Sequence, residues 1–229
     1  MARRLGETAE AGKPEARAQE APKRTGRPRA LAVDRALDKV ESRRMALAEA
    51  ALKTLAELGY ARTSLRDIAD KSEFTHGVLH YYFKDKTDLI CCAMRQYKAV
   101  CATRYDQVTI RAGTPGELIE GVAAKLAETL REDALNHRLW YDLRAQAMFE
   151  EAFQADVLEI DQRLEKMVWR IGARLSELSG SSIGLSPAAL YGLFDGLFQR
   201  SLLRHLTGEA SAAADLQDEA RRILTSLVR

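Results

Sequence analysis

Residues 63–90 read TSLRDIADKSEFTHGVLHYYFKDKTDLI, and this stretch decides the fold of the chain. It contains two short helical patterns separated by a tight break. Ser64 is placed to cap the first helix, because Asp67 follows three positions later. Thr75 is placed in the same way to cap a second helix over residues 76–82. A helix this short is not stable alone, so its neighbours must hold one side of it and leave the other side free.

The free side of the second helix suits a DNA duplex. Leu79 and Phe83 are four positions apart, so both can point inward. Histidine can donate to base acceptors, valine can meet a thymine methyl group, and glycine lets the backbone approach closely. The pattern predicts a recognition helix whose candidate contacts are Thr75, His76, Gly77, Val78, His80 and Tyr81. The alternative is a plain helical hairpin with solvated charges. The helix phase leaves open whether Tyr81 or Tyr82 lies outward.

The combined pattern of Thr-Ser, Ile-Ala, Gly-x-Leu-x-Tyr-Tyr-Phe and Lys-x-x-Leu resembles the helix-turn-helix of TetR-type transcriptional regulators. The resemblance covers residues 40–95 and implies that the recognition helix contacts DNA bases. It also implies a set of phosphate contacts made by Thr63, Ser64, Tyr82 and Lys86. In the turn, this chain has Ser72 and Glu73 where the family has a small residue and glycine. Glu73 must therefore adopt the turn geometry at some cost.

A basic arm precedes the helical patterns. Residues 1–30 contain eight Lys or Arg and four Glu, whereas the whole chain has a net charge of +2. We expect a flexible DNA-binding arm over residues 1–34, because Pro and Gly near Arg27 disfavour a regular helix. The Gly-Arg-Pro core resembles the minor-groove hook of architectural DNA proteins. The candidate contacts are Arg24, Arg27 and Arg29. The alternative is a solvated basic tail that adds only non-specific affinity.

The rest of the chain shows helical periodicity and no strand-like alternation. The sequence predicts an all-α fold with an N-terminal three-helix helix-turn-helix domain at residues 35–85. The family resemblance implies this architecture, with a larger C-terminal helical bundle for ligand binding and dimerisation at 86–229. The first helix is expected at 35–58, and the bundle helices are expected at 86–110, 115–132, 135–148, 151–178, 187–206 and 211–228.

Aromatic and methionine side chains gather in the middle of the predicted bundle. We expect some of them to line an apolar cavity for a small-molecule effector. The candidates are Trp140, Tyr141, Arg144, Met148, Phe149 and Trp169. Arg144 or His137 can fix a polar group of a ligand, and Trp and Tyr can hold a quaternary ammonium by cation–π contact. The alternative for each position is a plain core residue.

The family resemblance implies that the last two helices pair with those of a second subunit. The candidate residues for this homodimer are Leu190, Phe194, Leu197, Phe198, Leu216, Ile223 and Leu227. Residues 195–200, DGLFQR, are similar to the start of that interface in choline-responsive members of the family. A dimer is favoured because a single short recognition helix contacts too few base pairs for useful specificity. Ordinary core packing is the alternative.

Three cysteines, Cys91, Cys92 and Cys101, lie on one predicted helix. Ten residues of helix rise about 15 Å, which is beyond the reach of a disulfide. We therefore expect buried thiols, and a redox sensor with an intersubunit bond is the alternative. Their spacing matches no zinc site.

Composition sets the remaining expectations. The chain is 46% hydrophobic, enough for a real core. It shows neither a run of transmembrane length nor the apolar stretch of a signal peptide, so we expect a cytoplasmic protein without a membrane partner. No carboxylate pair, Ser-His-Asp set, glycine-rich phosphate loop or metal-ligand spacing stands out, so no enzyme activity, cofactor or metal is expected.

These observations lead to one leading hypothesis. The chain is expected to be a repressor that binds a palindromic double-stranded DNA operator as a homodimer and is released by a small molecule. One alternative is an architectural DNA-binding protein without an effector. A second is a redox-responsive regulator that acts through its cysteines. A third is a helical enzyme or carrier whose helical hairpin is accidental.

Overall fold

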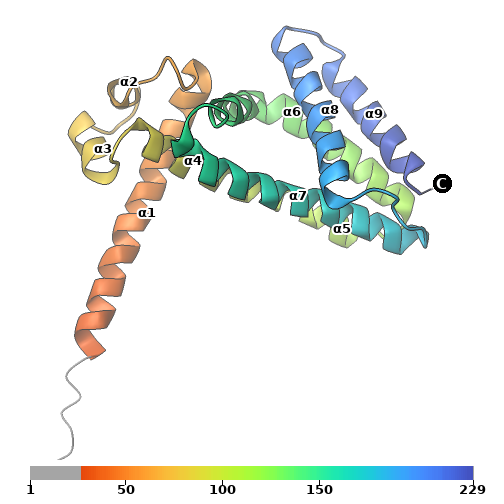
Figure 1. Cartoon of the computed structure of the whole chain (residues 1–229), viewed down its shortest axis with the longest axis horizontal. Helices are drawn as coiled ribbons and strands as arrows, with labels where there is room; N and C mark the ends of the chain where they lie inside the picture. Colours follow the sequence, from red (N-terminus) through yellow and green to blue (C-terminus); the bar gives the residue numbers. More distant parts are fainter. Residues whose placement is uncertain (1–26, 229) are drawn as a thin grey trace, which may run out of the picture. The chain divides into compact units, whose positions relative to one another are not determined.

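The computed structural model describes the backbone of residues 27–228 and the side chains of residues 38–228. Contacts divide the chain after Asp38, and residues Lys39–Arg229 form one compact unit. Within residues 27–228 there are nine helices and no strand, so the all-α prediction is confirmed. The helices, shown in Figure 1, are α1 (Arg27–Leu58), α2 (Leu65–Asp70), α3 (His76–Tyr82), α4 (Lys86–Cys101), α5 (Asp106–Arg111), α6 (Pro115–Gln146), α7 (Glu151–Ser179), α8 (Pro187–Leu206) and α9 (Ala212–Ser226).

Helix α1 begins earlier than the sequence pattern predicts. Its first residue is Arg27, eight positions before the expected start at residue 35. The expectation that Pro28 excludes a helix there is wrong. Proline in the first turn loses no helical hydrogen bond, and its fixed φ angle already suits a helix.

Two other helix boundaries differ from the prediction. The helix expected at 86–110 is divided between α4 and α5, because the chain turns after Cys101. In this turn the Thr103 hydroxyl donates to the Val100 carbonyl at 3.1 Å, and Tyr105 enters the core. The helices expected at 115–132 and 135–148 form one helix, α6, which is kinked at Asp133. The Arg104 guanidinium pairs with Asp133 and therefore connects the turn to the kink.

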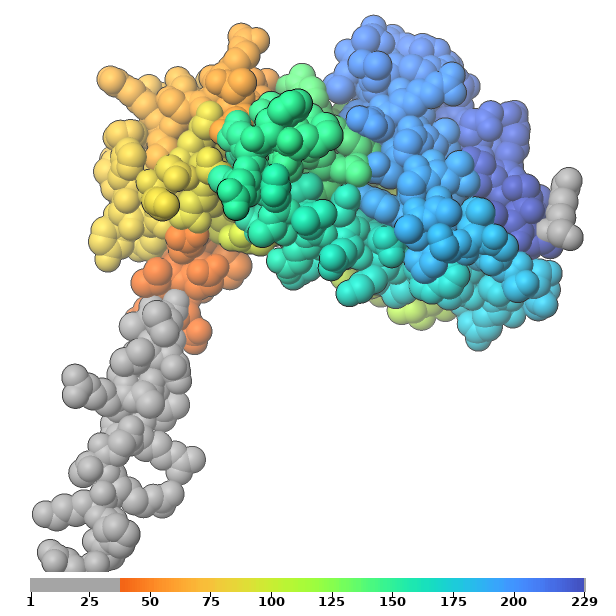
Figure 2. Space-filling model, in the orientation of Figure 1, coloured from red at the N-terminus to blue at the C-terminus, as the bar shows by residue number. Residues whose placement is uncertain are grey.

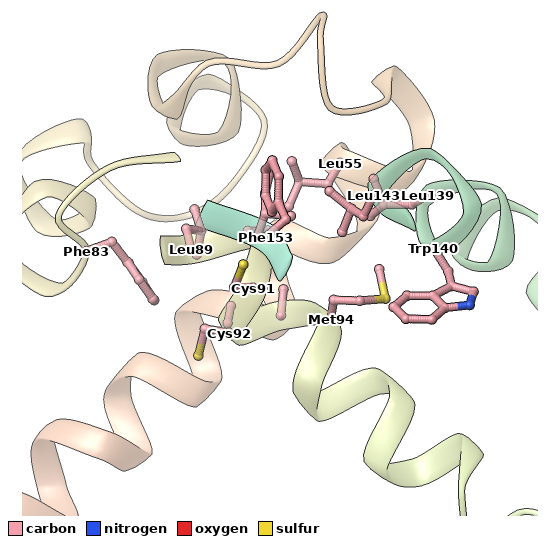
Figure 3. Packing of buried hydrophobic residues seen from close by; sticks show 14 of the residues in the cluster. Leu55, Phe83, Leu89, Cys91, Cys92, Met94, Leu139, Trp140, Leu143 and Phe153 are labelled. Carbon is pink, nitrogen blue, oxygen red and sulfur yellow. The ribbon is translucent and has the colours of Figure 1, made fainter. Parts of the chain in front are cut away.

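The largest hydrophobic cluster surrounds α4 (Figure 3). Leu55 of α1 and Phe83, at the end of α3, reach it from the helix-turn-helix region. Trp140 of α6 and Phe153 of α7 reach it from the bundle. The cluster crosses the predicted domain boundary between residues 85 and 86. That boundary therefore does not separate two independent hydrophobic cores.

Helices α6, α8 and α9 pack together in the second half of the chain (Figure 1). Two capping residues fix where these long helices begin. The Thr114 hydroxyl accepts from the Glu117 N–H at 3.2 Å, and the Ser186 hydroxyl accepts from the Ala189 N–H at 3.2 Å. Each cap is followed by proline in the first turn, as the sequence pattern predicts.

Candidate functional site

Short side-chain caps hold the two helices of the hairpin. Ser64 and Asp67 form a reciprocal capping box at the start of α2. Thr75 caps α3, and its hydroxyl accepts from the Val78 N–H at 3.3 Å. The Ser72 hydroxyl accepts from the Phe74 N–H at 3.2 Å and shapes the turn between the helices. The predicted bounds of α3 are confirmed by these caps and by the helix itself.

The exposed face of α3 carries most of the predicted base contacts. Thr75, His76, Gly77, His80 and Tyr81 are exposed, and Val78 is half-buried. Tyr81 is 78% exposed, whereas Tyr82 packs against the core, so Tyr81 is the outward tyrosine. The Nε2 atoms of His76 and His80 lie 3.1 Å apart. A Cβ built on Gly77 has no neighbour within 4 Å, so the backbone is open to a partner there.

A brace behind α3 has no counterpart in the sequence patterns described above. Arg44 of α1 donates to the Tyr82 carbonyl at 2.5 Å and to Asp88 Oδ1 at 2.8 Å. Its guanidinium also lies 4.7 Å from the centre of the Phe83 ring. Burial raises the pKa of Asp88, but the hydrogen bonds from Arg44 and from the Lys84 N–H outweigh it and leave this pKa lowered. Arg44 thus ties the end of α3 to α1 and α4.

The predicted phosphate contacts have different surroundings. Thr63 is buried and its hydroxyl donates to the Gly59 carbonyl at 2.7 Å, so its predicted phosphate contact is wrong. Ser64 is exposed at the start of α2. Lys86 donates to the Tyr60 carbonyl at 2.9 Å and lies 4.0 Å from the centre of the Tyr60 ring. Its ammonium therefore already has an acceptor within the chain.

The arm residues cannot be placed against this surface. Arg24 lies outside the described residues. Arg27 and Arg29 belong to the first turn of α1, and their side chains also lie outside the described residues. Their predicted contacts with DNA stay predictions.

A cavity of about 80 Å³ lies among α4, α6, α7 and α8. Trp140 and Tyr141 line it, as expected for a ligand site. Arg144 and Met148 line an open groove beside the cavity. Phe149 is 86% exposed and Trp169 packs in the bundle core, and neither lines the cavity or this groove. The prediction is therefore wrong for these two residues, because Phe149 lies in the turn between α6 and α7 and Trp169 packs against the second hydrophobic cluster.

Two titratable side chains, Lys98 and His137, lie together in this cavity, and the sequence pattern did not predict that they would meet. The Lys98 ammonium lies 3.2 Å from His137 Nδ1, and both residues are buried. Burial lowers the pKa of Lys98 to about 8. Burial also lowers the pKa of His137 well below its usual value, so its ring is neutral and Nδ1 accepts from Lys98. The sequence signal is the spacing of Lys98 with Cys91, Met94 and Cys101, which places a lysine on the apolar stripe of α4.

A polar network lies where the cavity meets the groove. Tyr141 donates to Asp195 Oδ1 at 2.9 Å, and Arg144 donates to Asp195 Oδ2 at 2.6 Å. Arg144 also reaches Asp161 at 3.3 Å, and Tyr191 donates to Asp161 at 2.6 Å. Helices α6, α7 and α8 are thereby joined beside the cavity.

Most predicted dimer residues belong to the core of the single chain. Leu190, Phe194, Phe198 and Leu216 are buried, so a contact with a second subunit is wrong for these four. Leu190 and Phe194 pack in a cluster with residues of α6 and α7, and Phe198 and Leu216 pack in a cluster with residues of α6. The other three, Leu197, Ile223 and Leu227, are half-buried against the same clusters. The large apolar residues exposed on α8 are Leu193, Leu203 and Leu206.

The cysteines are all reduced and buried. Burial raises the pKa of the Cys91 thiol to about 12, and burial also raises the pKa of Cys92. A protonated thiol is a poor nucleophile, so this arrangement gives the redox alternative no support. Among residues 27–228, no group of three or more His, Cys, Asp or Glu is placed to hold a metal ion. In the same part of the chain, no helix is long and apolar enough to cross a membrane.

Comparisons with known proteins agree with this arrangement. Residues 47–90 match the family model described as "Bacterial regulatory proteins, tetR family". The chain is 25% identical to the HTH-type transcriptional regulator BetI of Proteus mirabilis over 180 residues, which cover 77% of this chain and 88% of BetI. It is 23% identical to the regulator PksA of Bacillus subtilis, with 71% of this chain and 80% of PksA covered. The repressor KstR2 of Mycobacterium tuberculosis is 31% identical over 90 residues, 39% of this chain and 45% of KstR2.

Solved structures share the whole fold. A TetR transcription regulator from Haloarcula marismortui superposes with a TM-score of 0.67 at 16% identity, covering 82% of this chain and all of that one. FadR from Bacillus subtilis, solved in complex with stearoyl-CoA, gives a TM-score of 0.64 at 17% identity, covering 80% of this chain and 98% of FadR. The family model thus assigns residues 47–90 to the tetR family of bacterial regulatory proteins, and the chain shares its overall fold with solved TetR-type regulators.

Proposed function

We propose that the protein is a ligand-responsive repressor that binds a palindromic operator as a homodimer. The exposed face of α3 carries this proposal, because polar and small side chains project from a helix that Arg44 fixes from behind. Two such helices about 34–36 Å apart would enter successive major grooves. Phosphate contacts supply affinity, and base contacts select the site.

The proposed dimer surface is the outer side of α8 with the adjacent part of α9. Leu193, Leu203 and Leu206 are large apolar side chains exposed on α8, and Gly192 and Gly196 leave room for a close neighbour. In the space-filling view this blue surface is separated from the yellow surface of α3 by the rest of the body (Figure 2). A second subunit on α8 would therefore not cover the proposed DNA contacts.

The cavity supplies the proposed response. Lys98 belongs to α4, and the same helix begins with Lys86, which contacts the loop at Tyr60. A ligand that moves α4 would change the spacing of the two recognition helices. A coupling of about 1–3 kcal/mol weakens operator binding some 5–150-fold. FadR, which shares the fold, has been solved with stearoyl-CoA, and this supports the proposed ligand response. KstR2 is named a repressor, and this supports the proposed repression.

Footprinting on DNA that flanks the protein's own gene tests this proposal. We expect a discrete, two-fold symmetric footprint that weakens as salt increases, because phosphate contacts release counterions. The Tyr81→Ala variant should fold normally and lose the footprint at protein concentrations that protect DNA with the wild type. Diffuse protection would favour the architectural alternative. No salt-dependent binding at all would favour the accidental hairpin.

A further inference from the structure

The cavity among α4, α6, α7 and α8 contains a buried cation that has no anionic partner among residues 38–228. Lys98 is 3% exposed, and its hydrogen-bond partner among the described residues is the neutral ring of His137. No carboxylate lies within ion-pair distance of its ammonium in residues 38–228. A buried, unpaired ammonium is costly, so an arriving anion gains a strong and specific contact.

The acidic residue that does line the cavity is already engaged. Asp195 accepts from Tyr141 at Oδ1 and from Arg144 at Oδ2, and both distances lie within normal hydrogen-bond range. Its charge is thereby balanced by Arg144, on the groove side of the cavity. Asp195 is therefore not available as the counter-ion of Lys98.

Hydrogen-bond donors are in excess around Lys98. His137 Nδ1 accepts from Lys98, so the proton of the neutral ring is on Nε2. That Nε2 is buried and has no partner among the described residues, and the same holds for Trp140 Nε1. A ligand that supplies acceptor oxygen atoms would satisfy these groups. A ligand that supplies donors would leave them unpaired.

The position of Lys98 also argues against a cationic ligand. Its ammonium lies 5.0 Å from the centre of the Trp140 ring and 5.3 Å from that of Tyr97. The Arg144 guanidinium lies 5.8 Å from the Trp140 and Tyr141 rings. The chain's own cations thus already occupy the aromatic surroundings that a quaternary ammonium would need. The cation–π hypothesis from the sequence is therefore unfavourable at this site.

Arg104 and Thr129 also line the cavity, but Arg104 is already paired with Asp133 and donates to the Thr129 hydroxyl. Most of the remaining wall is apolar and leads away from Lys98. A neighbouring cavity of about 40 Å³ shares the lining residues Leu126, Met167 and Phe194. It continues toward Leu190 of α8 and Leu224 of α9. An apolar cavity of about 150 Å³ holds benzene, and these two spaces together are smaller, so a hydrocarbon tail that fits them as they stand must be short.

We propose that this cavity binds a small amphipathic carboxylate, with the carboxylate on Lys98 and His137 and the hydrocarbon tail toward α9. The inference rests on the proposed ligand response and names the chemical class of its effector. Charge-assisted hydrogen bonds in a buried site would select the anion, and apolar burial would set the preferred tail length.

Calorimetric titration of the full chain tests this chemistry without DNA. The probes are straight-chain carboxylates from butanoate to decanoate, the 1-alkanols of the same lengths, and the matching alkyltrimethylammonium ions. We expect saturable carboxylate binding with an optimum length, and affinity at least about tenfold weaker for the matched alcohol, since a hydrogen bond to a charged group is stronger than one between neutral groups. Equal affinity for acid and alcohol, preference for the ammonium ion, or no carboxylate binding overturns the proposal.

A matched pair of variants tests whether Lys98 makes the contact with the carboxylate. Lys98→Met keeps the length and apolar stem of the side chain and should weaken carboxylate binding at least about tenfold while leaving alcohol binding unchanged. Lys166→Met, an exposed position on α7, should bind like the wild type. Unchanged carboxylate affinity in Lys98→Met overturns the assignment. Because the acid–alcohol comparison uses the wild type, it holds even if this variant folds poorly.

The operator experiment is separate. If carboxylates bind but leave the DNA footprint unchanged, the proposed anion site is supported and the proposed ligand response is refuted. If the chain gives a symmetric footprint but binds no carboxylate, the proposed DNA-binding role is supported and a carboxylate effector is refuted.

Discussion

At the scale of single residues, Gly77 distinguishes a DNA contact from a structural role. A methyl group added there meets no atom of the chain within 4 Å. Gly77→Ala should therefore leave the unfolding free energy unchanged or slightly raised, because alanine favours helix over glycine by about 0.5–1 kcal/mol. The methyl group would crowd an approaching duplex, and overpacking a close contact costs about 1–3 kcal/mol. We expect operator affinity, measured by gel shift, to fall at least about tenfold.

The control for this prediction is Gly116→Ala in α6, where an added methyl group also has no neighbour within 4 Å. It should change neither urea unfolding nor operator affinity by much. If Gly77→Ala binds the operator as tightly as this control, the duplex does not approach Gly77.

Lys98 predicts an unusual dependence of stability on pH. Its pKa in the folded chain is about 8, lowered first by burial and also by Arg104 and Arg144, while Cys101 and Asp195 act in the opposite direction. In the unfolded chain a lysine has a pKa of about 10.4. Between these values the unfolded state binds more protons, so stability rises with pH by up to about 1.4 kcal/mol per pH unit. Below pH 8 both states hold the proton, and Lys98 adds no slope.

Urea unfolding from pH 7 to pH 10 measures this effect. The comparison is with Lys98→Met, since other lysines, tyrosines and thiols titrate equally in both proteins. The difference in unfolding free energy between wild type and variant should shift in favour of the wild type above pH 8. A constant difference across this range would mean that Lys98 keeps its ordinary pKa in the folded chain.

At the scale of helices, the packing of α5 on α6 depends on Gly121. A Cβ at this position would lie 2.6 Å from Cγ1 of Val108. Gly121→Ala therefore forces α5 or the Val108 side chain to move, and we expect a loss of about 1–3 kcal/mol of unfolding free energy. Thermal and urea unfolding give the value. Gly116→Ala, on the same helix, provides the matched comparison, and an equally stable Gly121→Ala would refute this close packing.

The sequence predicts helices best where a side chain fixes an end. Thr75, Thr114 and Ser186 cap α3, α6 and α8, and all three starts agree with the prediction. The break between α4 and α5 has no proline, glycine or side-chain cap to mark it. It arises because Tyr105 enters the core, which is a tertiary effect. The local sequence pattern therefore predicted one continuous helix across the turn between α4 and α5.

The site was predictable to the extent that local periodicity places side chains. Leu79 fixes the phase of α3, so His76 and His80 follow on its outer face. Burial of Lys98 depends on α6 and α8 packing over α4. From the local sequence alone, a lysine at this position is expected to be exposed to solvent. The same limit applies to Phe198, which is buried against residues of α6 and α9 within the single chain. Contacts between distant helices decide these cases.

At the scale of the whole molecule, Leu203 tests the proposed dimer. It is 65% exposed on α8, so Leu203→Glu should leave the fold of the single chain intact. A charge in the centre of an apolar interface would be desolvated without a partner, and we expect the variant to be monomeric at concentrations where the wild type is dimeric. Analytical ultracentrifugation measures this. Operator affinity should fall with it, because one recognition helix reads only a half-site.

Ile110→Glu, at a 72% exposed position on α5, serves as the control and should remain dimeric. Dimers in both variants would move the interface away from α8. Monomers in both would indicate a general effect of added charge.

The hydrophobic cluster around α4 has a consequence for protein engineering. Leu55 and Phe83 from the DNA-binding side share this cluster with Trp140 and Phe153 from the bundle. In a chimaera joined at residue 85, the side chains from the donor would pack against a surface that did not evolve with them. The shared hydrophobic cluster would then be poorly packed. Exchange of operator specificity should instead be confined to the outer residues of α3, which can be recoded while the shared interior is kept whole.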